Sequence, residues 1–150
     1  MFKGNVFKDN EQQAPGFTLP LAEALDHMSW NADGLVPAIA QQHDTGEVLM
    51  VAWMNREALE DTLRTGRVCY FSRSRQTLWR KGESSGQTQQ LIELRIDCDG
   101  DVVLMQVDQT GPACHTGRRD CFFWRADGNT LVLDKTPLVD PATLYPNKTR

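Results

Sequence analysis

Three short turn signals separate apolar segments along this chain of 150 residues. Short turns that contain Gly with Asp or Asn, between apolar runs of about four to eight residues, are typical of β-hairpins. We therefore predict strands on both sides of each signal, a further strand in the apolar run at 68–71, and another at 77–81. The signals are D-T-G at 44–46, D-G-D at 99–101 and D-G-N at 127–129, and the flanking strands are expected at 35–42 and 47–54, at 88–98 and 102–107, and at 121–125 and 130–133.

Helical signals are fewer. Asn55 is a suitable N-cap for a short amphipathic helix that Gly66 would end. Apolar residues at helical spacing predict a second helix that begins at Thr18 or Pro20 and ends before Asn31. The sequence thus predicts a mainly β (α+β) fold, an antiparallel sheet domain with two or three short helices.

The apolar pattern also predicts positions within the sheet and the limits of the domain. The strand at 47–54 is apolar on both faces, which favours a central position, whereas Pro37 favours an edge or the beginning of its strand. The polar residues 1–16 are expected to form a mobile or loosely docked arm, and the proline-containing residues 137–150 a loosely folded tail. Residues 17–136 would then form one domain.

Composition excludes several classes of protein. Apolar residues make up 40% and charged residues 24%, a globular balance, and no apolar run approaches the roughly 20 residues that cross a bilayer. Because the first residues lack the apolar region of a secretory signal, we expect a cytoplasmic protein with reduced thiols and no membrane partner. The net charge of −4 disfavours nucleic acid as a partner. Basic side chains concentrate at 64–81, which suits a small polyanionic ligand.

Residues 97–121 hold three of the four cysteines, at Cys98, Cys114 and Cys121. Their spacing differs from the paired C-x-x-C of a zinc ribbon, and disulfides or buried small hydrophobic residues are alternatives. Disulfides are disfavoured in a reducing compartment, and Cys69, on an apolar strand, fits the buried alternative better. Three cysteines beside polar residues favour a metal site that keeps a fourth position open.

The same stretch carries carboxylates and a histidine. Asp97, Asp99 and Asp101 would share one face of an extended backbone, with Cys98 on the other. Crowded carboxylates favour a hard cation such as Mg²⁺, although a solvated acidic turn is a strong alternative. His115 lies in a polar loop, where it would ligate a metal or move protons.

A second polar segment reads W-R-K-G-E-S-S-G at 79–86. Its glycines and serines offer backbone and hydroxyl donors to phosphate, and the basic residues nearby offer charge. A flexible basic loop is the alternative, but Trp79 needs a surface to cover. The basic residues are Arg73, Arg75, Arg80 and Lys81.

The chain resembles the phosphoribosyl-AMP cyclohydrolase family of histidine biosynthesis through an ordered series of motifs between residues 34 and 124. These are VLMVAWMNREAL, the TG at 65–66, YFSRSR, LWRKGESSG, DCDGD and ACHTGRRDCF. The resemblance implies an intertwined, obligate homodimer with shared active sites. It also implies one Zn²⁺ per subunit on Cys98, Cys114 and Cys121, drawn from both subunits, and Mg²⁺ on Asp97, Asp99 and Asp101.

The implied reaction is hydrolysis of the N1–C6 bond of 1-(5-phosphoribosyl)-AMP to the formimino-AICAR ribotide (ProFAR). We expect His115 to shuttle protons, and a monofunctional enzyme because no pyrophosphatase domain follows. Asp120 stands where the family commonly has Ser. A zinc deaminase is disfavoured because the motifs H-x-E and P-C-x-x-C are absent. A zinc module that binds single-stranded nucleic acid is disfavoured by the acidic total charge. The residues expected to bind substrate and its phosphates are Arg73, Arg75, Trp79, Lys81, Gly82, Glu83, Ser84 and Ser85.

Overall fold

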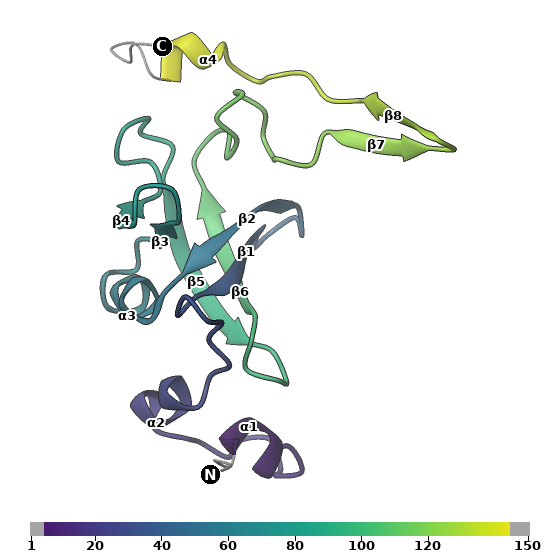
Figure 1. Cartoon of the computed structure of the whole chain (residues 1–150). Helices are drawn as coiled ribbons and strands as arrows, with labels where there is room; N and C mark the ends of the chain where they lie inside the picture. The colour runs from purple at the N-terminus through teal and green to yellow at the C-terminus, as the bar shows by residue number, and fades with distance from the viewer. Residues whose placement is uncertain (1–4, 145–150) are drawn as a thin grey trace.

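A computed structural model describes residues 5–144. Its main element is a four-stranded sheet with the strand order β2-β1-β6-β5 (Figure 1). The β1–β2 and β5–β6 pairs are antiparallel hairpins, while β1 and β6 join the two hairpins through a parallel pairing. The predicted antiparallel fold is therefore confirmed, with one parallel junction. The strands are β1 (Val36–Gln42), β2 (Val48–Met54), β5 (Gln89–Ile96) and β6 (Val103–Gln109).

Two small antiparallel hairpins flank this sheet. β3 (Cys69–Ser72) pairs with β4 (Thr77–Arg80), and β7 (Trp124–Asp127) pairs with β8 (Thr130–Leu133). The β3–β4 hairpin lies next to α3 (Arg56–Thr65), whereas the β7–β8 hairpin extends away from the main sheet (Figure 1). The β7–β8 hairpin turns at the predicted D-G-N signal, and β3 and β4 lie at the two predicted runs, 68–71 and 77–81. The strand predicted at 121–125 begins later, because residues 121–123 precede β7.

Helix α3 forms where local signals place it. The Asn55 side chain accepts a hydrogen bond from the Ala58 N–H at 2.8 Å, which caps the first turn. Gly66 ends the helix with a φ of 76°, a left-handed conformation that glycine adopts without steric cost. The described residues also contain the predicted α2 (Leu21–Asp26) and two unpredicted single-turn helices, α1 (Val6–Asp9) and α4 (Pro141–Leu144).

The hydrophobic core fills the space between one face of the sheet and α3 with β3. Strand β6 alternates buried and partly buried residues, so that Val103, Met105 and Val107 point into this core. Tyr70 of β3 is fully buried and donates a hydrogen bond of 2.7 Å from its hydroxyl to Gln89 Oε1. Burial of this phenol without such a partner would be costly.

One expectation needs correction. Strand β2 lies at the edge of the sheet rather than at its centre, and its Val48 and Val51 are 45% and 49% exposed. Within the arm predicted at 1–16, Val6 is buried and its N–H donates to His27 Nδ1. Pro37 lies at the beginning of β1, as predicted, and the pairing of β1 with β6 begins one residue later. The missing N–H of the proline is therefore not needed in that pairing. Among residues 5–144, no helix is long and apolar enough to cross a membrane.

Candidate metal and phosphate site

A compact loop after β6, residues 110–121 (the cysteine loop), brings two of the predicted zinc cysteines together. The Cys114 N–H donates to the Arg118 carbonyl at 3.2 Å, and the Cys121 N–H donates to the Leu49 carbonyl of β2 at 2.9 Å. Although Cys121 as a whole residue is exposed, its thiol lies within hydrogen-bonding reach of Cys114. The pKa of this thiol is raised to about 12, mainly because the thiol is buried and secondly because it interacts with Cys114. Two adjacent thiols of this kind are suitable soft ligands for zinc.

The basic loop after β4 contacts this cysteine loop through Lys81. The Lys81 side chain is buried, and its ammonium donates a hydrogen bond of 2.5 Å to the Ala113 carbonyl, next to Cys114. Burial lowers the pKa of Lys81, while Cys121 and Cys114 act in the opposite direction. Two of the predicted zinc ligands, Cys114 and Cys121, are thus neighbours of the predicted phosphate region.

A cavity of about 360 Å³ opens in this basic loop. Trp79 lines it and has its ring centroid 5.0 Å from that of Tyr70, so the surface that the indole needs is partly supplied by the core. Arg73 lies elsewhere, with its guanidinium 4.7 Å above the Trp53 ring. Arg80 reaches the buried Asp61 at 2.9 Å. The residues that line the cavity are Arg75, Trp79, Arg80, Lys81, Gly82, Glu83, Ser84 and Ser85, which include all the predicted substrate residues except Arg73.

The acidic segment forms a turn rather than an extended strand. β5 ends at Ile96, Gly100 has a φ of 70°, and the Asp101 N–H donates to Asp97 Oδ1 at 3.0 Å. The predicted alternation of Asp97, Cys98 and Asp99 between two faces is therefore wrong. One ligand atom from each of these three residues lies within 4.8 Å of the others.

The carboxyl groups of this turn lie close enough to change one another's pKa. The pKa of Asp101 is raised, mainly by its hydrogen bond with Asp97. Burial and repulsion from the charges of Asp97 and Asp99 add to this effect. Burial acts to raise the pKa of Asp97. Hydrogen bonds from Asp101 and from nearby N–H groups outweigh this effect, so the pKa of Asp97 is lowered. Crowding of this kind is relieved by a bound cation, and oxygen-rich ligands fit Mg²⁺.

The third predicted zinc ligand lies far from the other two. Cys98 is in the turn before β6, while Cys114 and Cys121 follow the other end of that strand (Figure 1). The seven residues of β6 alone span ~20 Å at about 3.4 Å per residue. One chain therefore brings Cys114 and Cys121 together and leaves Cys98 at the opposite end. This donor set fits a zinc ion only if a second copy supplies Cys98.

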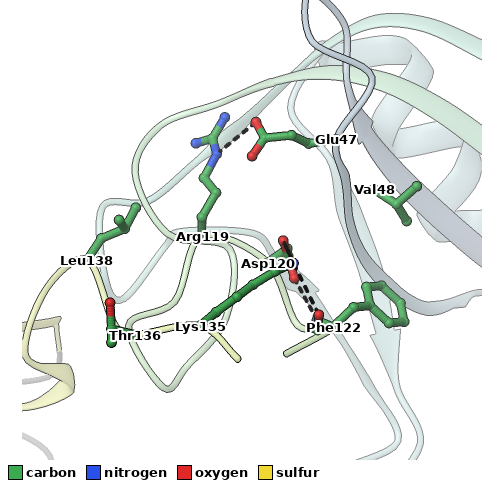
Figure 2. Close-up of a pocket in the computed structure, with 8 residues that line it drawn as sticks. All are labelled: Glu47, Val48, Arg119, Asp120, Phe122, Lys135, Thr136 and Leu138. Carbon is green, nitrogen blue, oxygen red and sulfur yellow. Dashed lines mark hydrogen bonds and ion pairs between the residues drawn. The ribbon is translucent and has the colours of Figure 1, made fainter. Parts of the chain in front are cut away.

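His115 and Asp120 occupy different environments in the cysteine loop. His115 is exposed beside Cys114, where it is free to approach a ligand. Asp120 is buried, and its carboxylate accepts from the Phe122 N–H at 2.7 Å and from Lys135 Nζ at 2.8 Å (Figure 2). Asp120 thus ties the loop to the segment after β8.

Sequence reasoning missed a second cavity of about 670 Å³ next to Asp120 (Figure 2). Arg119 lies on its wall, pairs with Glu47 at 3.4 Å and donates to the carbonyls of Gln109 and Gly111. These bonds hold the beginning of the cysteine loop. The only signal in the sequence was the arginine pair at 118–119, which gives no indication of its partners. The cavity is lined by Glu47, Val48, Arg119, Asp120, Phe122, Lys135, Thr136 and Leu138.

Comparisons with known proteins give a consistent result. A family model described as phosphoribosyl-AMP cyclohydrolase matches residues 50–123. A phosphoribosyl-AMP cyclohydrolase of Alcanivorax borkumensis is 70% identical over 140 residues, which cover 93% of this chain and 99% of that protein. Enzymes of the same name from Alkalilimnicola ehrlichii and Halorhodospira halophila are 67% and 64% identical over the same shares.

Proposed function

The chain belongs to the phosphoribosyl-AMP cyclohydrolase family, and we propose that it hydrolyses the N1–C6 bond of 1-(5-phosphoribosyl)-AMP in histidine biosynthesis. Water adds its oxygen to C6, and N1 takes up a proton as the bond breaks. Both fragments remain attached to the product, ProFAR, so nothing is released. Apart from the similarity to the family, the observation that supports this proposal is the thiol pair of Cys114 and Cys121 beside a basic cavity.

The ligands on the chain support two kinds of metal. Cys114 and Cys121 would hold zinc together with Cys98 of a second copy, and Asp97, Asp99 and Asp101 would hold Mg²⁺ in the acidic turn. Zinc in such a site supplies Lewis acidity that activates water near neutral pH. The protein's own contribution is to keep the thiol pair, the cavity and His115 in a fixed arrangement.

The cavity after β4 suits the charged ends of the substrate. Its exposed Arg75 offers a bidentate cation, and Ser84 and Ser85 offer hydroxyl donors to a phosphate. Glu83 has a different task, because its carboxylate accepts from the Arg80 N–H at 3.0 Å and shapes the loop. Trp79 provides an apolar wall on which the base would pack.

His115 is the group that we assign to proton transfer. It follows a thiol ligand directly, is exposed, and carries the side chain best suited to exchange protons near neutral pH. In this role it protonates N1 as the ring opens.

A homodimer completes the site in this proposal. Each copy provides two cysteines at one end of β6 and one cysteine at the other, so two copies in antiparallel contact form two sets of three. As an enzyme of amino-acid biosynthesis, the dimer would act in the cytoplasm.

The proposal is tested by metal content and turnover in cysteine variants. We expect Cys114→Ala to lose zinc and the absorbance change of ring opening, because a two-thiol site binds zinc weakly. Cys69→Ala is the matched control, since Cys69 is buried in the core, where its N–H and carbonyl bond to the Thr62 hydroxyl. Full turnover by zinc-free Cys114→Ala would refute the zinc assignment, and release of ammonia by the unmodified chain would show a deaminase instead.

A further inference from the structure

Lys81 differs from the other basic residues of its segment in being buried. Arg73, Arg75 and Arg80 are exposed, whereas Lys81 is only 9% exposed. Burial of an ammonium group is strongly unfavourable unless opposite charge and hydrogen bonds compensate. Lys81 therefore needs partners within the fold.

The partners of Lys81 come from the cysteine loop. Its Nζ donates to the Ala113 carbonyl at 2.5 Å and lies 5.9 Å from the centroid of the Trp79 ring. Of the titratable groups in residues 5–144, those that act on this ammonium are Cys114 and Cys121. No carboxylate in that part of the chain forms an ion pair with it. The hydrogen bond to Ala113 places the ammonium next to Cys114, and the thiols there become anionic when a metal displaces their protons.

We propose that Lys81 is a positioning residue of the zinc site, which fixes the backbone before Cys114 and supplies the positive charge that two adjacent thiolates require. This inference rests on the proposed function, since it presumes that zinc binds to Cys114 and Cys121. Three thiolates around Zn²⁺ carry one net negative charge, which a buried ammonium nearby offsets. In this proposal Lys81 acts on the zinc site, whereas its sequence context and its place on the cavity wall predict a phosphate ligand.

Zinc affinity, measured by competition with a chromophoric chelator, tests this role without any turnover. Lys81→Met keeps most of the apolar stem and removes the charge, so we expect its zinc dissociation constant to rise by about 10- to 100-fold, the usual effect of removing an outer partner of a metal ligand. Lys81→Arg, which restores the charge, should recover most of the affinity. Lys8→Met, at an exposed position, is the matched control and should leave it unchanged. Circular dichroism checks that each variant is folded.

The outcomes separate this inference from the zinc assignment itself. If the unmodified chain binds zinc and folded Lys81→Met binds it equally well, Lys81 has no role in the site. A rise in KM for the nucleotide with zinc affinity unchanged would return Lys81 to phosphate binding and overturn the proposal. If Lys81→Met does not fold, Lys81→Arg and Lys81→Gln decide, since tighter zinc binding by Arg supports the charge and equal binding refutes it. Absence of zinc binding by the unmodified chain would instead remove the proposed function along with this role.

Discussion

Two buried thiols show how position decides the use of a single residue type. Burial raises the pKa of Cys69 to about 11 and that of Cys121 to about 12. Cys69 lies among core residues of β3, and its thiol donates to a backbone carbonyl. Cys121 instead meets a second thiol and the ammonium of Lys81. A metal that displaces protons from thiols has two neighbouring ligands only in the second environment.

At the same scale, His115 offers a test of proton transfer. We expect His115→Ala to lower kcat by about 100-fold or more, the usual contribution of a positioned acid or base, with zinc content unchanged. His43→Ala is the control, since His43 is exposed and lies beyond the end of β1. Steady-state kinetics with metal analysis measures both. Loss of zinc in His115→Ala would identify the histidine as a metal ligand or its support.

The buried pair of Tyr70 and Gln89 gives a prediction about stability. Tyr70→Phe leaves the Gln89 Oε1 without its donor in the core, so the free energy of unfolding should fall by ~1–3 kcal/mol. Urea denaturation measures this change. Tyr70→Phe with Gln89→Leu removes both polar partners and should cost less than the sum of the two single substitutions. Strict additivity would show that the hydrogen bond contributes little.

At the scale of elements, α3 depends on its cap and supports the candidate site. It carries the buried Asp61, which pairs with Arg80 on the wall of the basic cavity. Asn55→Ala removes the side-chain acceptor of the Ala58 N–H and should lower the free energy of unfolding by ~1 kcal/mol. Asn55→Asp retains an acceptor and should remain close to the unmodified chain. Equal losses in both variants would contradict the capping role.

Elements with strong local signals were predictable, and their positions in the sheet were not. The cap and stop of α3 and the turns of the hairpins depend on a few adjacent residues, which the sequence shows directly. The apolar run of β2 predicts burial on both faces, but the same run also fits an edge strand that presents Val48 and Val51 for a further contact.

The candidate site shows the same division. The motifs identified the cysteines, carboxylates and cavity residues, and the structure brings Cys114, Cys121 and residues 79–85 together. The turn at 97–101 was not predicted, because alternate aspartates fit both an extended strand and a turn with Gly100 at positive φ. Nor does the sequence distinguish the buried Lys81 from exposed arginines, because its burial depends on a loop about 30 residues further along the chain.

At the scale of the whole molecule, apolar surface remains uncovered in a single copy. The projecting β7–β8 hairpin exposes Trp124 and Leu131, which are 57% and 64% exposed, and the β2 edge exposes Val48 and Val51 (Figure 1). Large apolar side chains exposed on strands are frequent at protein–protein contacts. Together with the remote position of Cys98, it supports the proposed dimer.

Complementation between inactive variants tests that dimer. Cys98→Ala and Cys114→Ala are each expected to be inactive, because every site in their homodimers lacks one ligand. If sites form between copies, co-refolding the two variants in equal amounts makes half of the dimers mixed, and each mixed dimer has one intact site. Activity should then recover to about a quarter of that of the unmodified chain, as measured by ring-opening absorbance. Co-refolded Cys114→Ala and Cys121→Ala is the matched control and should stay inactive, because both defects fall in the half of the site that one copy supplies. No recovery with the first pair would mean that sites are not shared between copies.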